Sequence, residues 1–316
     1  MKKKISIATS CYNEAGNIQS FYDRCLAVLK QFPEYDYEFV VSDNGSDDGT
    51  RPILRDIASK DPHFKVILNA GNFGQLRSPF NAIRSASGDA VAVLCSDLQE
   101  PPELIADFIR KWQEGAPIVA GVRSGAENAF FTNFLRGIYY RVLARIAPDQ
   151  RIICDFTGFG LYDRKVIHAL REFNDASPYF RGMVSETGFP VVTVPFRQQE
   201  RKAGKTKNNL FSLYDYAMTG LINHTKLPLR FAVFCGFTLG FISFLVSLAY
   251  LIMKLVYWDS FSFGMAPLMI GMFFFASIQI IFIGLLGEYI GAIWTQVRRR
   301  PLVVEEERIN FDQTRS

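Results

Sequence analysis

The sequence predicts an α/β domain built on a mostly parallel sheet, followed by a C-terminal hairpin of two membrane-spanning helices. Two observations predict the domain: short β-rich runs alternate with amphipathic stretches of helical length, and polar turns follow the runs. A third observation predicts the hairpin, because two long segments near the C-terminus contain no charged residue. The 316 residues are 49% hydrophobic and 21% charged, which excludes a disordered chain and a multi-span transporter.

Strands and helices alternate along the first part of the chain. The predicted strands occupy residues 5–8, 38–42, 65–68, 90–95 and 118–120. The predicted helices occupy residues 17–32, 50–60, 75–87 and 102–112. In the first of these helices, one face carries Ile18, Phe21, Cys25 and Leu29. This alternation predicts right-handed crossovers between parallel strands, with helices on both faces of the sheet.

The two uncharged segments cover residues 231–253 and 261–287. As a helix, each is long enough to cross roughly 30 Å of hydrocarbon, although a buried core helix is the alternative for an apolar run. Basic residues flank the pair, with Lys226 and Arg230 before it and residues 298–300 after it. The positive-inside rule therefore places the first domain and both termini in the cytoplasm.

Charge and cysteine content exclude several classes of protein. The net charge of +4 is modest and no nucleic-acid motif accompanies it, so we expect a lipid surface rather than a nucleic acid as partner. Five cysteines without a CxxC pair argue against a disulfide framework or a zinc ribbon. The N-terminus lacks an apolar run of signal-peptide length, and we interpret it as mature protein.

Polar turns follow three of the predicted strands, at residues 10–14, 42–50 and 95–102. Parallel strands bring their carboxyl ends to one edge of the sheet, where ligands of such folds bind. Helix capping and turn formation explain any one of these turns equally well. Three carboxylate-bearing turns on one edge favour a binding site.

These turns read YNE at 12–14, DNGSDDGT at 43–50 and SDLQEPPE at 96–103. In this order and spacing they resemble glycosyltransferase family 2, which has the GT-A nucleotide-sugar fold. The closer resemblance is to the polyisoprenyl-phosphate glycosyltransferases, meaning dolichol-phosphate mannose synthase and the bacterial bactoprenol glucosyltransferases. It extends through NFGQ at 72–75, AGVR at 120–123, DFTGFGLYDRKV at 155–166 and RKAGKTK at 201–207.

The resemblance implies inverting transfer of one sugar, in the first place glucose from UDP-glucose, to undecaprenyl phosphate. The reaction would take place on the cytoplasmic leaflet of the bacterial inner (plasma) membrane and give a lipid-linked sugar for cell-envelope glycosylation. GDP-mannose as donor, a processive polysaccharide synthase and a non-enzymatic membrane scaffold are the alternatives. The expected domains are a GT-A catalytic domain at 1–208, an amphipathic juxtamembrane segment at 209–230, transmembrane helices at 231–256 and 261–290, and a cytoplasmic tail at 291–316. We also expect a homo-oligomer, with a tetramer as one arrangement.

The resemblance also assigns the donor site. Family members hold a divalent cation with an Asp-x-Asp turn followed by Gln, but here Cys95 replaces the first Asp. This leaves Asp97 and Gln99 as ligands for Mg²⁺ or Mn²⁺, because a hard cation disfavours a thiol. The residues expected to bind the nucleotide sugar are Ser10, Tyr12, Glu14, Ser42, Asp43, Asn44, Ser96, Asp97, Gln99 and Arg123.

A lipid phosphate acceptor needs cations more than it needs a general base. Its second pKa is near 6, so at neutral pH it arrives largely as a dianion. We expect Arg136, Arg201, Lys205 and Lys207 to hold this phosphate, because arginines and lysines are the usual phosphate ligands. Asp155 matches the acidic residue near the acceptor in the family, and we assign it and Asp97 as the catalytic residues. A solvated charged loop is the alternative for residues 201–207.

Overall fold

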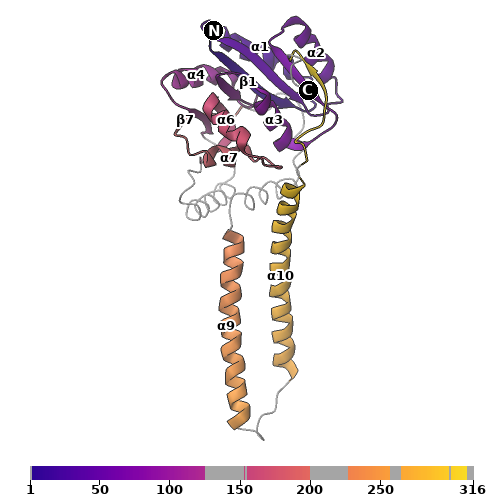
Figure 1. Cartoon of the computed structure of the whole chain (residues 1–316), viewed down its shortest axis with the longest axis vertical. Coiled ribbons are helices and arrows are strands. Elements are labelled where there is room, and N and C mark those ends of the chain that lie inside the picture. Colours follow the sequence, from indigo (N-terminus) through magenta and orange to yellow (C-terminus); the bar gives the residue numbers. More distant parts are fainter. Residues whose placement is uncertain are drawn as a thin grey trace. The chain divides into compact units, whose positions relative to one another are not determined.

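Eight strands of the described residues form one mixed, mostly parallel sheet (Figure 1). The computed structural model describes residues 2–124, 153, 155–199, 227–256, 265–298 and 300–311. The chain divides into two units, residues 1–209 with 299–316 and residues 210–298, and the sheet belongs to the first. The strand order is β7-β5-β6-β4-β1-β2-β3-β8.

The strands have the following bounds: β1 Lys4–Cys11, β2 Asp36–Asp43, β3 Phe64–Asn69, β4 Ala90–Val93, β5 Ile118–Arg123, β6 Phe156–Asp163, β7 Val191–Phe196 and β8 Glu305–Ile309. Strands β4, β1, β2 and β3 are parallel neighbours, as is the pair β5 and β7. Strand β6 runs antiparallel to β4 and β5, and β8 runs antiparallel to β3. The predicted α/β class with a mostly parallel sheet is therefore confirmed.

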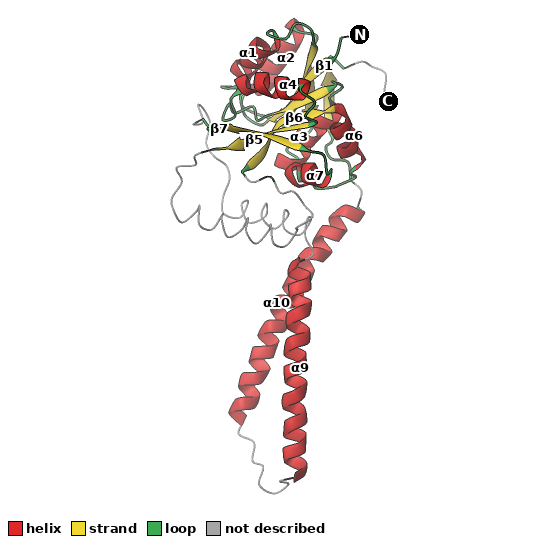
Figure 2. Cartoon of the chain, turned by 90° about the vertical axis from the view of Figure 1, so that its left-hand side faces the viewer, coloured by secondary structure: helices red, strands yellow, loops and turns green. Residues whose placement is uncertain are grey.

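The helices of this unit are α1 Ile18–Leu29, α2 Thr50–Lys60, α3 Gly74–Ser85, the short 3₁₀ helix η1 Pro102–Leu104, α4 Ile105–Gln113, α6 Arg164–Glu172 and α7 Phe180–Glu186. Figure 2 shows α1, α2 and α4 on one face of the sheet and α3, α6 and α7 on the other. Each group of helices buries its apolar side in a separate cluster against the sheet. Helices thus cover both faces, which is typical of parallel sheets.

The central strands are buried on both faces. In β2, Phe39 and Val41 pack into the cluster under α1, α2 and α4, while Val40 packs into the opposite cluster. Alternate residues of a strand point to opposite faces, so a strand covered on both sides needs apolar residues at consecutive positions. This requirement explains why the sequence shows these strands as continuous apolar runs.

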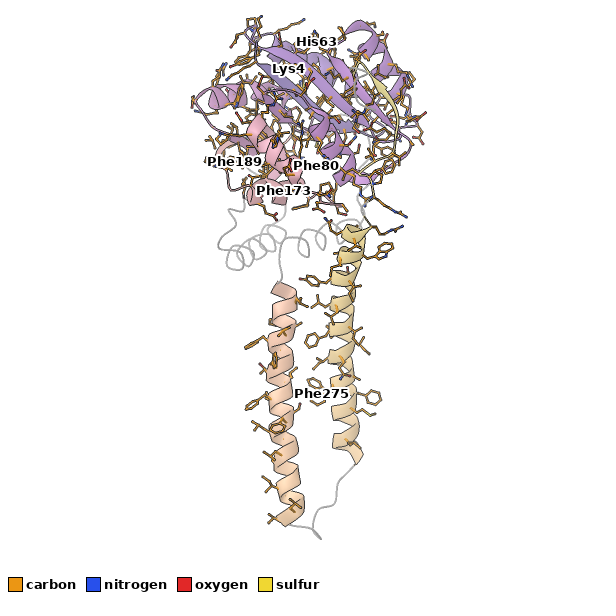
Figure 3. All side chains as sticks on the ribbon, viewed as in Figure 1. Lys4, His63, Phe80, Phe173, Phe189 and Phe275 are labelled. Atoms are coloured by element: carbon orange, nitrogen blue, oxygen red, sulfur yellow. The ribbon has the colours of Figure 1, made fainter. Side chains whose placement is uncertain are left out.

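The second unit contains two long apolar helices, α9 Leu227–Val256 and α10 Met265–Val297. Many of their large apolar side chains are exposed, among them Phe234, Phe241, Phe273 and Ile281. Figure 3 shows the side chains along both helices, with Phe275 labelled. Within the described residues, one segment, Gly271–Val297, is long and apolar enough to cross a membrane, and α9 contains the shorter apolar stretch Phe231–Val246. Residues 209–226 of the predicted juxtamembrane segment lie outside the described residues.

Candidate functional site

The three polar turns meet at the carboxyl edge of β4, β1 and β2, which are adjacent in the sheet. Ser10 and Cys11 are in register with Ser42 and Asp43, and the Asn44 N–H donates to the Cys11 carbonyl over 2.9 Å. The third turn joins them because the Ser96 hydroxyl donates to the Ser10 carbonyl over 3.0 Å. The sequence therefore predicted the neighbourhood of these turns correctly.

Hydrogen bonds join the turn after β1 to the turn after β2. The Asn13 N–H donates to the Ser46 hydroxyl (2.9 Å), and the Asn13 amide exchanges hydrogen bonds with Asp47 (2.7 and 3.0 Å). The Glu14 N–H donates to the Thr50 hydroxyl over 2.9 Å. Asn13 has a left-handed backbone (φ 58°), a conformation that costs energy outside glycine and concentrates at functional sites. The two turns are thus held as one surface.

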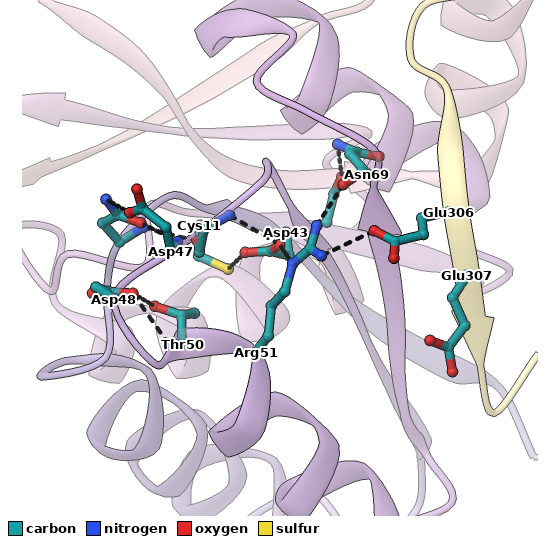
Figure 4. Close-up of polar contacts among 12 residues, drawn as sticks. Cys11, Asp43, Asp47, Asp48, Thr50, Arg51, Asn69, Glu306 and Glu307 are labelled. Carbon is teal, nitrogen blue, oxygen red and sulfur yellow. Dashed lines mark hydrogen bonds and ion pairs between the residues drawn. The ribbon is translucent and has the colours of Figure 1, made fainter.

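Asp43, at the end of β2, has no exposed surface. Its Oδ2 accepts from the Ser46 N–H (3.2 Å) and from Arg51 Nε (2.8 Å), and its Oδ1 lies 3.9 Å from Cys11 Sγ (Figure 4). Burial and the charge of Asp43 both raise the pKa of the Cys11 thiol, so the thiol stays neutral. In this structure Asp43 anchors the turn that follows it.

The other predicted residues of this turn support its shape. Asn44 is buried; its Nδ2 donates to Asn72 Oδ1 (2.9 Å) and its Oδ1 accepts from the Phe73 N–H (2.8 Å). Gly45 has φ 79°, and a Cβ there would lie 2.7 Å from the Gly71 carbonyl carbon, so the two loops require glycine to pack this closely. The Ser42 hydroxyl lies in the interior, bonded to Ser78 and Asn69. Ser10, Tyr12 and Glu14 are half-buried at the edge.

The predicted metal ligands lie on a tight turn after β4. Leu98, between them, has a left-handed backbone (φ 61°), which is a clear outlier for a bulky residue. Asp97 Oδ1 accepts from the Gln99 N–H (3.2 Å), and Gln99 Oε1 accepts from Gln198 Nε2 (2.8 Å). Within the described part of the chain, no three His, Cys, Asp or Glu residues gather as a metal site. Asp97 and Gln99 supply one half-buried carboxylate and one amide oxygen. This oxygen set fits Mg²⁺ or Mn²⁺, because such ions are commonly bound by one or two protein oxygens together with the phosphates of a substrate.

A hydrogen bond between Cys95 and Glu100 holds the start of this turn to its end. Strand β4 ends at Val93, earlier than predicted, because the chain turns so that the Cys95 N–H donates to Glu100 Oε2 (2.9 Å). The other oxygen of the buried Glu100 accepts from the Thr157 hydroxyl (2.6 Å), and burial raises the pKa of Glu100. The nearby charge of Glu100, followed by burial, raises the pKa of the Cys95 thiol.

The acceptor side is described in part. Asp155 lies just before β6 with a left-handed backbone (φ 55°), and its carbonyl accepts from the N–H of Arg123 at the end of β5 (3.1 Å). Thr157, two residues later, contacts Glu100, so the Asp155 turn is joined to the turn of the predicted metal ligands. Arg136, Arg201, Lys205 and Lys207 lie outside the described residues.

Sequence reasoning missed four residues that organise the site: Glu100, Thr157, Arg51 and Gln198. Glu100 is part of the SDLQEPPE motif, but nothing in the letters shows that its side chain turns inward. The contacts of Arg51 and Gln198 link segments far apart in the chain, and only the fold reveals them.

The chain is similar to known proteins along most of its length. Residues 6–171 match the family model described as Glycosyl transferase family 2. The chain is 33% identical over 311 residues to the glycosyltransferase YkcC of Bacillus subtilis, covering 98% of this chain and 95% of that protein. It is 30% identical over 298 residues to the bactoprenol glucosyl transferase of Shigella phage SfII, covering 94% of this chain and 96% of that protein.

A solved structure of the mannosyltransferase PcManGT from Pyrobaculum calidifontis, in complex with GDP-Man and Mn²⁺, is also similar. It is 18% identical, with a TM-score of 0.47, and the match covers 73% of this chain and 65% of that chain.

Proposed function

Because the chain belongs to glycosyltransferase family 2, we propose that it transfers one sugar from a nucleotide-sugar donor to a polyisoprenyl phosphate in the membrane. The observation that carries this proposal is the meeting of three polar turns at the carboxyl edge of β4, β1 and β2. Similarity to bactoprenol glucosyl transferases over 94% of the chain, including the apolar helices, supports the lipid acceptor.

The proposed donor is UDP-glucose, bound across the turns at residues 10–14 and 43–50. Ribose hydroxyls and a base N–H are donors, and the half-buried side chains of Ser10, Tyr12 and Glu14 offer oxygens to accept from them. Asp43 and Asn44 shape this surface through the contacts that hold both turns. GDP-mannose is the second candidate donor.

Asp97 and Gln99 are the proposed ligands of Mg²⁺ or Mn²⁺ at the sugar diphosphate. A bound divalent cation would offset the charge that develops on the departing nucleotide diphosphate. The hydrogen bond from Gln198 fixes the orientation of the Gln99 amide, and the Gln99 oxygen keeps a second lone pair for a ligand. Arg123, half-buried beside Asp155, is a cationic side chain that would face the same phosphates.

The chemistry follows from the ionisation of the acceptor. A phosphate oxygen of the lipid attacks the anomeric carbon while the bond from that carbon to the diphosphate breaks, so a single displacement inverts the configuration. Since the phosphate is already largely a dianion, no strong base is required, and Asp155 would orient the acceptor. Arg136, Arg201, Lys205 and Lys207 are the proposed phosphate ligands.

We propose that α9 and α10 hold the enzyme in the bacterial plasma membrane, with the sheet-bearing unit and both termini in the cytoplasm. The exposed apolar side chains of both helices support their placement in lipid, because the same surface in water would cause aggregation. Basic residues at 298–300, directly after α10, support the cytoplasmic orientation. A homo-oligomer is proposed on family resemblance.

The test is a transfer assay with the full-length chain in detergent and in bilayers. UDP-glucose, UDP-galactose and GDP-mannose are each supplied with and without undecaprenyl phosphate, and with Mg²⁺, Mn²⁺ or EDTA. We expect nucleotide diphosphate release and a lipid-linked sugar only when donor, lipid phosphate and metal are all present. Release without any lipid-linked product would refute the acceptor, and no release from any donor would favour a non-enzymatic scaffold.

A further inference from the structure

We propose that the C-terminal strand β8 positions the donor-binding turns, and that Arg51 is the residue through which it does so. The inference rests on the proposed function, since it takes the turns after β1 and β2 as the nucleotide site. Strand β8 comes from residues 305–309, beyond both apolar helices, yet it forms an edge of the same sheet. The chain of contacts runs from Glu306 on β8, through Arg51 and Asp43, to both turns.

Arg51, in the first turn of α2, donates hydrogen bonds from its guanidinium group to three different residues (Figure 4). Nε donates to Asp43 Oδ2 (2.8 Å), one terminal nitrogen donates to Glu306 Oε2 (2.9 Å), and the other donates to the Asn69 carbonyl. The guanidinium is planar and rigid, so fixing any two of its contacts fixes the direction of the third. Glu306 and Asn69 together therefore set how Arg51 meets Asp43.

Asp43 transmits this position to the two turns. Its Oδ2, which binds Arg51, also accepts from the Ser46 N–H, and the Ser46 hydroxyl accepts from the Asn13 N–H. Asn13 in turn exchanges side-chain hydrogen bonds with Asp47. A shift of the Arg51 guanidinium thus moves a buried carboxylate that is bonded directly to the backbone of the donor surface.

A β-bulge points Glu306 toward Arg51. Leu68 pairs with Glu307 and Asn69 pairs with Glu305, so Glu306 is an extra residue in β8 without a register partner. Consecutive residues of a regular strand point to opposite faces, yet Glu306 and Glu307 both reach α2, where they pair with Arg51 and Arg55. Bulges commonly redirect a side chain beside an active site, and this one gives Arg51 its second carboxylate.

The chain supplies a matched control in the neighbouring ion pair. Arg55 and Glu307 join the same helix to the same strand, but the guanidinium of Arg55 pairs with this surface carboxylate instead of with Asp43. Strand β8 also remains attached through Asn310, whose Nδ2 donates to the carbonyls of Ala58 (2.7 Å) and Phe64 (2.9 Å). Breaking either ion pair therefore leaves β8 bound to the sheet, and only the Arg51 pair leads to the donor turns.

The experiment compares Arg51→Gln with Arg55→Gln in the full-length chain. Loss of a charge-assisted hydrogen bond corresponds to roughly tenfold or more in affinity, so Arg51→Gln should raise the donor KM and the Kd of UDP about tenfold. We expect kcat at saturating donor to stay within about twofold, because the metal turn and the acceptor side keep their contacts. Arg55→Gln should change KM, Kd and kcat by less than about twofold, because its pair is exposed.

Amide hydrogen exchange gives a second readout that does not depend on activity. Exchange at residues 12–15 and 44–50 should be faster in Arg51→Gln than in Arg55→Gln, because only the first change releases the turns. If Arg51→Gln fails to fold, Glu306→Gln replaces it and Glu307→Gln becomes its control. Glu306→Gln keeps the pair with Asp43, so a KM increase of about two- to threefold over the control is expected.

Equal KM increases in the two arginine variants would overturn the inference, because they would show that β8 contributes only general stability. Unchanged KM and unchanged exchange in Arg51→Gln would overturn it as well. If the wild-type protein binds neither UDP nor GDP, the proposed function fails, and hydrogen exchange alone then decides whether Arg51 holds the two turns.

Discussion

Glu100 joins the turn of the predicted metal ligands to the turn that carries Asp155, and we predict that this junction contributes measurably to stability. Glu100 is 4% exposed and accepts one hydrogen bond from Thr157 and one from the Cys95 N–H. The change Thr157→Val removes one donor while keeping the shape of the side chain. The change Glu100→Gln keeps the size of the acceptor but replaces one of its oxygens by a donor.

The magnitude follows from these two bonds. A hydrogen bond to a carboxylate contributes about 1.5–3 kcal/mol, so Thr157→Val should lower the free energy of unfolding by about 2 kcal/mol. In Glu100→Gln the remaining oxygen accepts from the Cys95 N–H and the NH₂ group donates to the Thr157 hydroxyl, so a charge-assisted bond is replaced by a neutral one at a cost of about 1–2 kcal/mol. Because both changes alter the bond between residues 100 and 157, the cost of the double variant should be about 1 kcal/mol smaller than the sum of the two single costs.

The assay is urea or thermal unfolding of the full-length chain in detergent, followed by tryptophan fluorescence or circular dichroism. For a unit of this size, a loss of about 2 kcal/mol corresponds to a fall in Tm of roughly 4–8 °C. Ser96→Ala, which removes a single hydroxyl from the same turn, serves as the control for nonspecific loosening. Strict additivity of the two changes, or a cost of Thr157→Val below about 0.5 kcal/mol, would refute the junction.

Three further predictions concern the metal, acid stability and the acceptor. Asp97→Asn should lower metal-dependent transfer about 100-fold, whereas Cys95→Ser should stay within about twofold in the same assay; equal loss would contradict the ligand assignment. Although burial alone would raise the pKa of Glu38, hydrogen bonds from Lys65, Ser6 and Ser87 lower it below its ordinary value of 4.5. Its contribution to stability is therefore complete above about pH 4.5 and is lost as the pH falls further, so unfolding curves measured between about pH 6 and 2 should show a shallower acid decline for Glu38→Gln than for the wild type. Arg201→Ala should lower transfer to undecaprenyl phosphate roughly 10- to 100-fold and spare slow donor hydrolysis, measured side by side, and equal loss of both activities would move Arg201 to the diphosphate.

The sequence was informative wherever a local pattern decides local structure. Helix α2 has the predicted bounds Thr50–Lys60, and the strands at 5–8, 38–42 and 65–68 all lie within observed strands. Periodicity succeeds here because the same apolar residues that mark an element also form its buried face. Element ends were less certain: α1 ends at Leu29 rather than at 32, because the N–H groups of Gln31 and Phe32 bond to carbonyls three residues back and so form a tighter turn.

The sequence did not predict the antiparallel strands β6 and β8. Strand β6 carries five glycine or aromatic residues in the DFTGFGLYDRKV motif and gives little strand-like alternation. Strand β8 reads EEERI, and such a charged run is typical of a solvated tail. It is a strand because β3 has an open edge and because Arg51 and Arg55 on α2 pair with its glutamates. No local pattern in residues 305–309 contains that information.

For the site residues too, the sequence predicted their positions, whereas the contacts of their side chains became known only from the tertiary structure. Order and spacing of the turns determined that Ser10, Asp43 and Asp97 lie at one edge of the sheet, because parallel strands with right-handed crossovers bring their carboxyl ends together. Only the tertiary structure decided that Asp43 is wholly buried against Arg51 and that Glu100 faces Thr157. Strand and turn positions follow from interactions between residues close in sequence, whereas the direction of a charged side chain depends on which distant group can neutralise it in the folded interior.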